Sequence, residues 1–98
     1  MAFDRRFLDE LIERSDIVDV VGSYVPLTKK GANYWACCPF HNEKTPSFSV
    51  SQDKQMCYCF GCKKGGGVIN FVMEMENLSY PDAVRFLARR ANMTVPEE

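Results

Sequence analysis

Two pairs of potential metal ligands stand out in this sequence. Two residues separate Cys38 from His41, two separate Cys59 from Cys62, and seventeen lie between the pairs. A spacing of two lets a tight turn aim both side chains at one point, and the intervening residues match a hairpin. Three thiolates and one imidazole suit tetrahedral Zn²⁺. Because protein groups fill all four positions, we expect one structural zinc ion with no open position for water.

The other two cysteines, Cys37 and Cys57, fit no such spacing with a partner. We interpret them as small apolar residues of strands. Two alternatives to the metal site remain: unrelated buried thiols, and a redox pair formed by Cys59 and Cys62. The redox pair requires a βαβ setting, which the surrounding pattern does not provide. An odd cysteine count also disfavours a framework made only of disulfides.

Length and composition predict a single small domain spanning residues 1–98, of which 46% are hydrophobic and 26% charged. A core of this size is marginal, and a metal often stabilises such a domain. No apolar run reaches the roughly 18 residues of a membrane span. The N-terminus also lacks the apolar stretch of a signal peptide. We therefore expect a cytoplasmic protein with no membrane partner.

Charge is unevenly distributed along the chain. Residues 25–64 carry six lysines against Glu43 and Asp53, a net charge of +4. Residues 1–24 and 65–98 carry net charges of −3 and −2. A randomly charged surface is one interpretation. The other is a basic surface for phosphates, since every lysine lies in the segment that holds the cysteines.

The periodicity of apolar residues predicts an α+β fold. Helices are expected over 4–22, the first over 4–14 and the second beginning at Asp16 and ending at Gly22. Segment 24–64 predicts an antiparallel meander with strands 24–28, 33–37, 48–51 and 55–58. Helices follow within 68–92, the first over 68–76 and the last capped by Ser79. Residues 95–98 resemble the start of a linker.

Lysines and aromatic residues alternate through the meander, a combination that holds single-stranded nucleic acid by base stacking and phosphate contacts. The wider set contains Lys29, Lys30, Tyr34, Trp35, Lys44, Phe48, Lys54, Tyr58, Lys63 and Lys64. As DNA contacts we select Lys30, Tyr34, Lys44, Phe48 and Lys54. For each ring the alternative is packing in the core.

Catalysis finds little support in these residues. No paired carboxylates lie near the metal ligands, and the one histidine is assigned to the metal. Gly65-Gly66-Gly67 opens a predicted helix and could bind an anion, although a hinge is the simpler interpretation. No catalytic residue is assigned.

Several runs resemble the N-terminal zinc-binding domain of bacterial DNA primase. They are Asn33-Tyr34, Cys38-Pro39-Phe40-His41, the run from Glu43 to Val50, Cys59-Phe60-Gly61-Cys62 and Gly65-Gly66. The similarity extends over nearly the whole chain. It implies a zinc ribbon on a small antiparallel sheet, flanked by N-terminal and C-terminal helices. Gly67 departs from the Asp or Asn that is frequent there, which weakens a helix cap.

The resemblance also implies a function in DNA replication. Such a domain binds the single-stranded DNA template and helps select start sites for RNA primer synthesis. The polymerase domain of the parent primase, a nucleotidyltransferase that uses Mg²⁺, lies elsewhere in the longer chain, and the replicative helicase binds a C-terminal domain. These 98 residues alone are expected to be non-catalytic.

Two other functions are considered. The chain could be a zinc-stapled protein–protein adapter that docks on a polymerase domain without touching DNA. It could also be a freestanding enzyme, which would require a catalytic set that we do not find.

Overall fold

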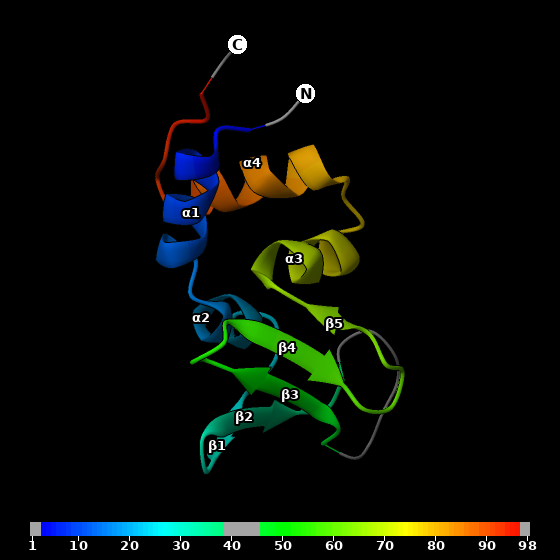
Figure 1. Cartoon of the computed structure of the whole chain (residues 1–98). Helices are drawn as coiled ribbons and strands as arrows, with labels where there is room; N and C mark the ends of the chain where they lie inside the picture. The colour runs from blue at the N-terminus through cyan, green and yellow to red at the C-terminus, as the bar shows by residue number, and fades with distance from the viewer. Residues whose placement is uncertain (1–2, 39–45, 97–98) are drawn as a thin grey trace.

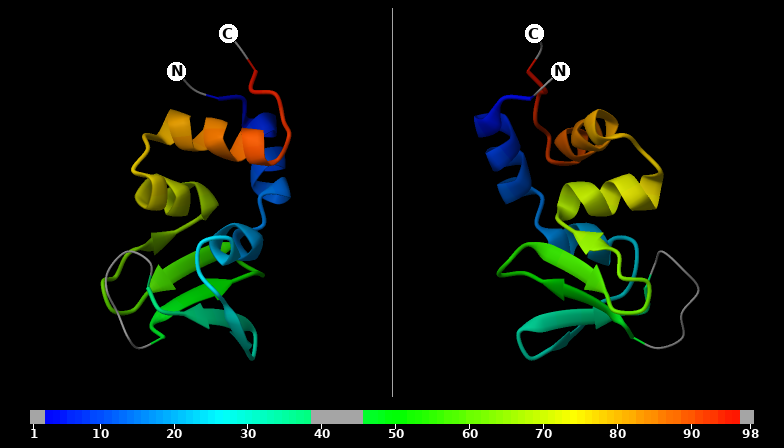
Figure 2. Two further views of the ribbon diagram at one scale, coloured as in Figure 1. Left: turned by 180° about the vertical axis from the view of Figure 1, so that it is seen from behind. Right: turned by 45° about the vertical axis from the view of Figure 1, so that its right-hand side comes forward.

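The computed structural model describes residues 3–38 and 46–96. Along these residues two helices precede a sheet and two more helices follow it. In Figure 1, α1, α3 and α4 gather at one end of the molecule, and the sheet forms the other end. The start of α1 and the segment after α4 lie close together at the helical end in all the views of Figures 1 and 2.

The N-terminal helices, α1 (Arg5–Arg14) and α2 (Ile17–Gly22), begin and end close to the predicted positions. The Asp16 carboxylate caps α2 by accepting a hydrogen bond from the Asp19 N–H at 3.3 Å. Both helices are amphipathic and bury one face. Their buried apolar residues are Phe7, Leu11, Ile17, Val20 and Val21.

The C-terminal helices are α3 (Val68–Glu76) and α4 (Tyr80–Arg90). Gly67 precedes α3 and offers no side chain to cap it. Ser79 caps α4, because its hydroxyl accepts a hydrogen bond from the Asp82 N–H at 3.4 Å. These bounds agree with the periodicity of the sequence.

The sheet is an antiparallel meander, in which each strand pairs with the next one along the chain. Its strands are β1 (Thr28–Lys30), β2 (Asn33–Ala36), β3 (Phe48–Ser51), β4 (Met56–Cys59) and β5 (Gly65–Gly66), in the order β1-β2-β3-β4-β5. The predicted α+β class, with helices at both ends of an antiparallel sheet, is confirmed.

Two strands differ from the prediction. Of the expected strand 24–28 only Thr28 is in the sheet, because the N–H groups of Tyr24 and Val25 instead bond to the Val21 carbonyl after α2. Strand β5 was not predicted. Its two glycines pair with Cys57 and Tyr58 through the backbone and contribute no side-chain pattern.

One face of the sheet packs against the helices. Phe48 and Val50 of β3 are fully buried, and the Phe48 ring centroid lies 6.1 Å from that of Phe71 in α3. Because side chains alternate along a strand, Ser49 and Ser51 point to the opposite face. We call this opposite surface the open face. The register adds Lys30, Trp35 and Tyr58 to it, among others.

Gln55 ties the turn between β3 and β4 to the start of α2. Its side-chain oxygen accepts a hydrogen bond from the Ile17 N–H at 2.9 Å. Its amide nitrogen donates to Asp16 Oδ1 at 2.8 Å and to the Gln52 carbonyl at 2.6 Å. The two halves of the fold are therefore joined by a polar contact as well as by the core.

Among the described residues, none of the helices combines the length and the apolar character needed to cross a bilayer.

Candidate metal centre and nucleic-acid interface

Three of the four predicted metal ligands come together at one end of the sheet. Cys38 follows β2, Cys59 ends β4, and Cys62 lies in the turn before β5. Their Sγ atoms all lie within 4.8 Å of one another. Cys38 and Cys59 are buried and Cys62 is half-buried. The fourth predicted ligand, His41, lies outside the described residues.

The spacing of the thiols fits a zinc ion. Cys38 Sγ and Cys62 Sγ are 3.6 Å apart. Two sulfur ligands of a tetrahedral zinc, each about 2.3 Å from the metal, lie about 3.8 Å from each other. The cluster is thus already close to the geometry that the metal requires.

The turn that carries Cys62 is held by backbone hydrogen bonds. The Lys63 N–H donates to the Cys59 carbonyl at 2.7 Å, and the Cys59 N–H donates to the Lys64 carbonyl at 2.8 Å. Glycine commonly takes a positive φ in such turns, but here Lys63, and not Gly61, has that conformation, with φ of 62°. The left-handed residue therefore follows the second cysteine of the pair.

The surroundings of Cys59 favour its thiolate. Burial on its own raises the pKa of this thiol. Hydrogen bonds from the Cys62 N–H and from the side chains of Cys38, Ser47 and Cys62 outweigh burial and lower the pKa to about 6. The Cys62 N–H lies 3.4 Å from Cys59 Sγ, and Ser47 Oγ lies 3.7 Å from it. A thiolate is the form that ligates metals.

The two remaining cysteines stay apart from this cluster. Cys57 is buried on β4, as expected for an apolar strand residue, and burial raises its pKa to about 11. Cys37 differs from our interpretation, because it lies just beyond β2 and is exposed. Its neighbour Cys38 is buried, so consecutive residues point to opposite sides.

Three aromatic rings gather on and beside the open face. The rings of Trp35 and Phe60 are stacked, with centroids 6.0 Å apart and planes 20° apart. Tyr58 meets Phe60 edge to face at 5.0 Å. Tyr58 is 40% exposed and Phe60 is 60% exposed, although neither ring is small. Rings that remain this accessible in a folded domain are candidates for contact with a partner.

Three lysines accompany these rings. Lys30 is exposed on β1, Lys54 lies in the turn before β4, and Lys63 lies in the turn after it. None of the three forms an ion pair within residues 3–38 and 46–96. Lys64, in contrast, pairs with Glu74 at 3.1 Å. Lys29 belongs to the other face, where its Nζ lies 6.0 Å from the centroid of the Tyr34 ring.

The structure places the five residues selected from the sequence as DNA contacts in different environments. Lys30 and Lys54 are exposed beside the rings. Phe48 is fully buried and packs on Phe71, so its assignment as a DNA contact is corrected to a core residue. Tyr34 is half-buried and packs against the core from the helical side. Lys44 lies outside the described residues.

The sequence prediction did not include the exposed ring of Phe60. Trp35, Tyr58 and Lys63 were in the wider set but were not selected. The alternation in β3 carried the signal that separates the two faces. Phe48 and Val50 mark the core face, so residues opposite Ser49 must lie on the open face. Those residues are Trp35 and Tyr58. The sequence prediction selected aromatic residues without considering which residues pair across the strands.

Sequence comparisons agree with this site. The family model described as the CHC2 zinc finger matches residues 3–98. The DNA primase of Pseudomonas putida is 63% identical over 92 residues, which cover 94% of this chain and 14% of the relative. The DNA primase of Staphylococcus aureus is 50% identical over 98 residues, which cover 100% of this chain and 16% of the relative. The chain thus spans about one seventh of the length of such relatives.

A solved structure has the same fold. It is the primase of Aquifex aeolicus, determined with its zinc-binding and RNA polymerase domains. The TM-score is 0.86 and the identity 45%, and the match covers 98% of this chain and 23% of that one. Together with the cysteine cluster, these matches show that the chain belongs to the CHC2 zinc finger family, the zinc-binding domain of DNA primase.

Proposed function

We propose that this chain is the template-binding module of a primase, and that it grips single-stranded DNA on the open face of its sheet. The observation that carries the proposal is the cluster of Trp35, Tyr58 and Phe60 on that face, together with lysines that form no ion pair with the described residues. Within residues 3–38 and 46–96, the core and the helices cover the opposite face, which leaves the open face to meet a strand.

The zinc ion in this proposal is structural. Cys38, Cys59 and Cys62 supply three thiolates, and His41 supplies the fourth ligand. When bound, the ion holds the end of β2 and the turn after β4 in one arrangement. No ligand position is left for water or substrate, so the metal takes no part in chemistry.

The rings supply the contact with bases. A base that stacks on an aromatic ring contributes roughly 1–3 kcal/mol, with little dependence on sequence. Phe60 offers the most accessible ring of the three, and the Trp35 ring stacks on it. Stacking of one ring on another fixes Phe60 before a strand arrives, which lowers the entropic cost of binding.

The lysines supply the contact with phosphates. Lys30 and Lys54 lie at one end of the sheet, where β1 and β3 end, and Lys63 lies at the other end, in the turn after β4. A strand that runs between the two ends therefore passes more than one ammonium group. Lys44, outside the described residues, remains a further proposed contact. Phe48 belongs to the core, and Tyr34, half-buried on the core face, is not included in the proposed interface.

The proposed function also concerns the longer protein of which this domain is a part. We propose that it synthesises RNA primers at the bacterial replication fork, in the cytoplasm, with Mg²⁺ in a separate polymerase domain. The zinc-binding domain would present the template to that domain and help select where primers start. The replicative helicase would bind elsewhere on the parent.

A protein–protein adapter is the second candidate function. The helical half exposes two apolar side chains, Ile12 at 37% and Tyr80 at 41%. Both line one hollow of about 330 Å³ with Ile69 of α3. A polymerase domain could dock there while the open face holds DNA, so the two functions are compatible.

Fluorescence anisotropy with a labelled thymidine oligonucleotide tests the proposal. The zinc-loaded chain should bind, and the logarithm of its affinity should fall linearly with the logarithm of salt between about 50 and 200 mM. Replacing Lys30 by Ala should reduce that slope by about 0.7. Lys29→Ala, on the same strand but the other face, is the matched control and should leave the slope unchanged. Absence of binding at low salt would refute the proposal and favour the adapter.

A further inference from the structure

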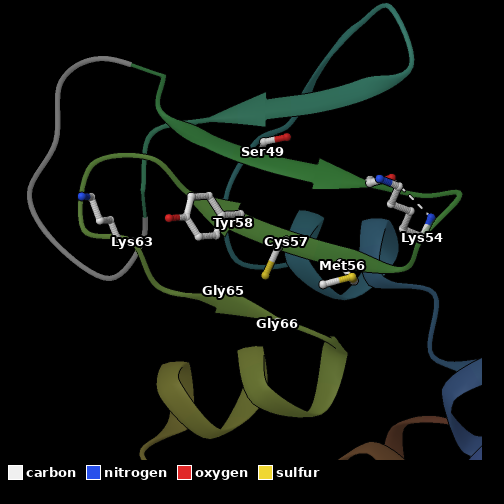
Figure 3. Close-up of a pocket in the computed structure, with 9 residues that line it drawn as sticks. Ser49, Lys54, Met56, Cys57, Tyr58, Lys63, Gly65 and Gly66 are labelled. Atoms are coloured by element: carbon white, nitrogen blue, oxygen red, sulfur yellow. Dashed lines mark hydrogen bonds between the residues drawn. The ribbon is translucent and has the colours of Figure 1, made fainter.

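A hollow of about 470 Å³ lies on the open face beside Tyr58 (Figure 3). Its volume is in the range of pockets that hold small organic groups. Its lining includes Ser49, Ser51, Lys54, Met56, Tyr58, Lys63 and Gly65. They come from β3, β4, β5 and the two turns that flank β4.

The short strand β5 holds Tyr58 at the rim of this hollow. Gly65 pairs with Tyr58, and a Cβ atom at Gly65 would come within 2.4 Å of the Cys57 carbonyl and 2.9 Å of Tyr58 Cδ1. Only glycine lets the two strands lie this close. The Tyr58 ring is therefore backed by the main chain of β5, while 40% of the residue remains exposed.

Ser49 offers the hollow an uncommitted hydroxyl. Its side chain forms no hydrogen bond with the part of the chain that the structure describes. The Ser51 hydroxyl also lines the hollow, and its oxygen accepts a hydrogen bond from the Lys54 N–H at 3.3 Å. The hollow thus combines an aromatic ring, the exposed Met56 side chain and the Ser49 hydroxyl.

Positively charged lysine side chains lie on both sides of the hollow. Figure 3 shows Lys54 and Lys63 toward opposite ends of β4, with Tyr58 and Met56 between them. Two ammonium groups on either side of an apolar hollow are complementary to a nucleic-acid strand, in which a flat base lies between two phosphates.

We propose that this hollow takes one nucleobase of the bound single strand, and that Ser49 reads the edge of that base. The base stacks on Tyr58 and contacts Met56, while Lys54 and Lys63 hold the phosphates on either side. This inference rests on the proposed function. It adds the place at which base identity is read, the hollow beside Tyr58, whereas the contact with Phe60 is indifferent to sequence.

The test compares the affinities of the zinc-loaded chain for thymidine, cytidine and adenosine homo-oligonucleotides of equal length. The wild-type chain should prefer one of them. Ser49→Ala should reduce that preference by about 2- to 10-fold, the net effect of one hydrogen bond, with the salt slope unchanged. Ser51→Ala is the matched control, on the same strand and face, and should keep the preference.

A second pair of variants tests the stacking contact independently of Ser49. Tyr58→Phe should keep the affinity, whereas Tyr58→Ala should lower it, and circular dichroism checks that both variants fold. Equal wild-type affinities for the three oligonucleotides, or a preference that survives Ser49→Ala, would overturn the base pocket while leaving DNA binding by the open face intact. Failure of the wild-type chain to bind any of them would overturn the proposed function itself.

Discussion

Cys38 Sγ and Cys62 Sγ lie 3.6 Å apart, although 24 positions of sequence separate them. The first follows β2 and the second precedes β5, so their approach closes one end of the sheet. The same approach brings Trp35, near Cys38, against Phe60, near Cys62, with ring centroids 6.0 Å apart. The arrangement of the metal ligands and the arrangement of the rings are therefore coupled.

Neighbouring cysteines provide a direct test of the metal centre. Cys38→Ser should abolish stoichiometric zinc binding and unfold most of the chain, because structural zinc binding and folding are linked. Cys37→Ser should bind one zinc ion and fold normally, because Cys37 is exposed and lies outside the cluster. Metal analysis and circular dichroism measure both effects. Equal zinc content in the two variants would contradict the ligand assignment.

The corrected position of Phe48 gives a second prediction. Phe48→Ala should cost about 3–5 kcal/mol of unfolding free energy, because it leaves a cavity beside Phe71. Phe60→Ala should change that free energy by only about 0.5 kcal/mol but weaken DNA binding. Denaturation and anisotropy separate the two outcomes. A strong loss of stability in Phe60→Ala would place its ring in the core and undermine the proposed interface.

Gln55 provides a third prediction. Its φ of 53° is left-handed, so Gln55→Ala combines backbone strain with the loss of three hydrogen bonds. Gln55→Gly removes the same bonds without the strain. We expect both variants to lose about 1–3 kcal/mol in urea denaturation, with Ala the less stable. If Gln52→Ala, on the exposed edge of the same network, cost as much, Gln55 would not be the main connection.

Tyr24 gives a prediction that depends on pH. Burial, together with its hydrogen bond to Glu76 at 2.6 Å, raises the pKa of Tyr24 from 10.0 to about 12. Since the folded pKa is higher than the unfolded one, this stabilisation is complete below pH 10 and is lost between about pH 10 and 12. Tyr24→Phe should cost about 1 kcal/mol at neutral pH. The difference in stability between wild type and variant should shrink across that alkaline range, and a constant difference would contradict the assignment.

The helices and most of the strands were predictable because local signals agree with the tertiary structure. Asp16 and Ser79 cap the helices that they precede, and the apolar period of residues 68–76 sets the bounds of α3. The ligand spacing likewise anticipated that Cys38, Cys59 and Cys62 would meet. In each case the information lies within a few residues of the feature.

The elements that were not predicted depend on distant contacts. Strand β5 is two glycines whose pairing with β4 follows from the position of the metal-bearing turn. Residues 24–27 had a strand-like composition, but the ring of Tyr24 packs on Phe71, 5.5 Å away, and its N–H completes the end of α2. The role of Phe48 depended on which face of β3 the helices cover. None of these could be read from local patterns.

The most direct test of the account is NMR mapping of the zinc-loaded chain with a short thymidine oligonucleotide. We predict that the amide shifts that change on titration belong to the open face and its turns, around Lys30, Trp35, Ser49, Tyr58 and Phe60. Resonances of α1 and α4 should stay in place. Shifts confined to those two helices, or no shifts at all, would contradict the claim that the open face binds single-stranded DNA.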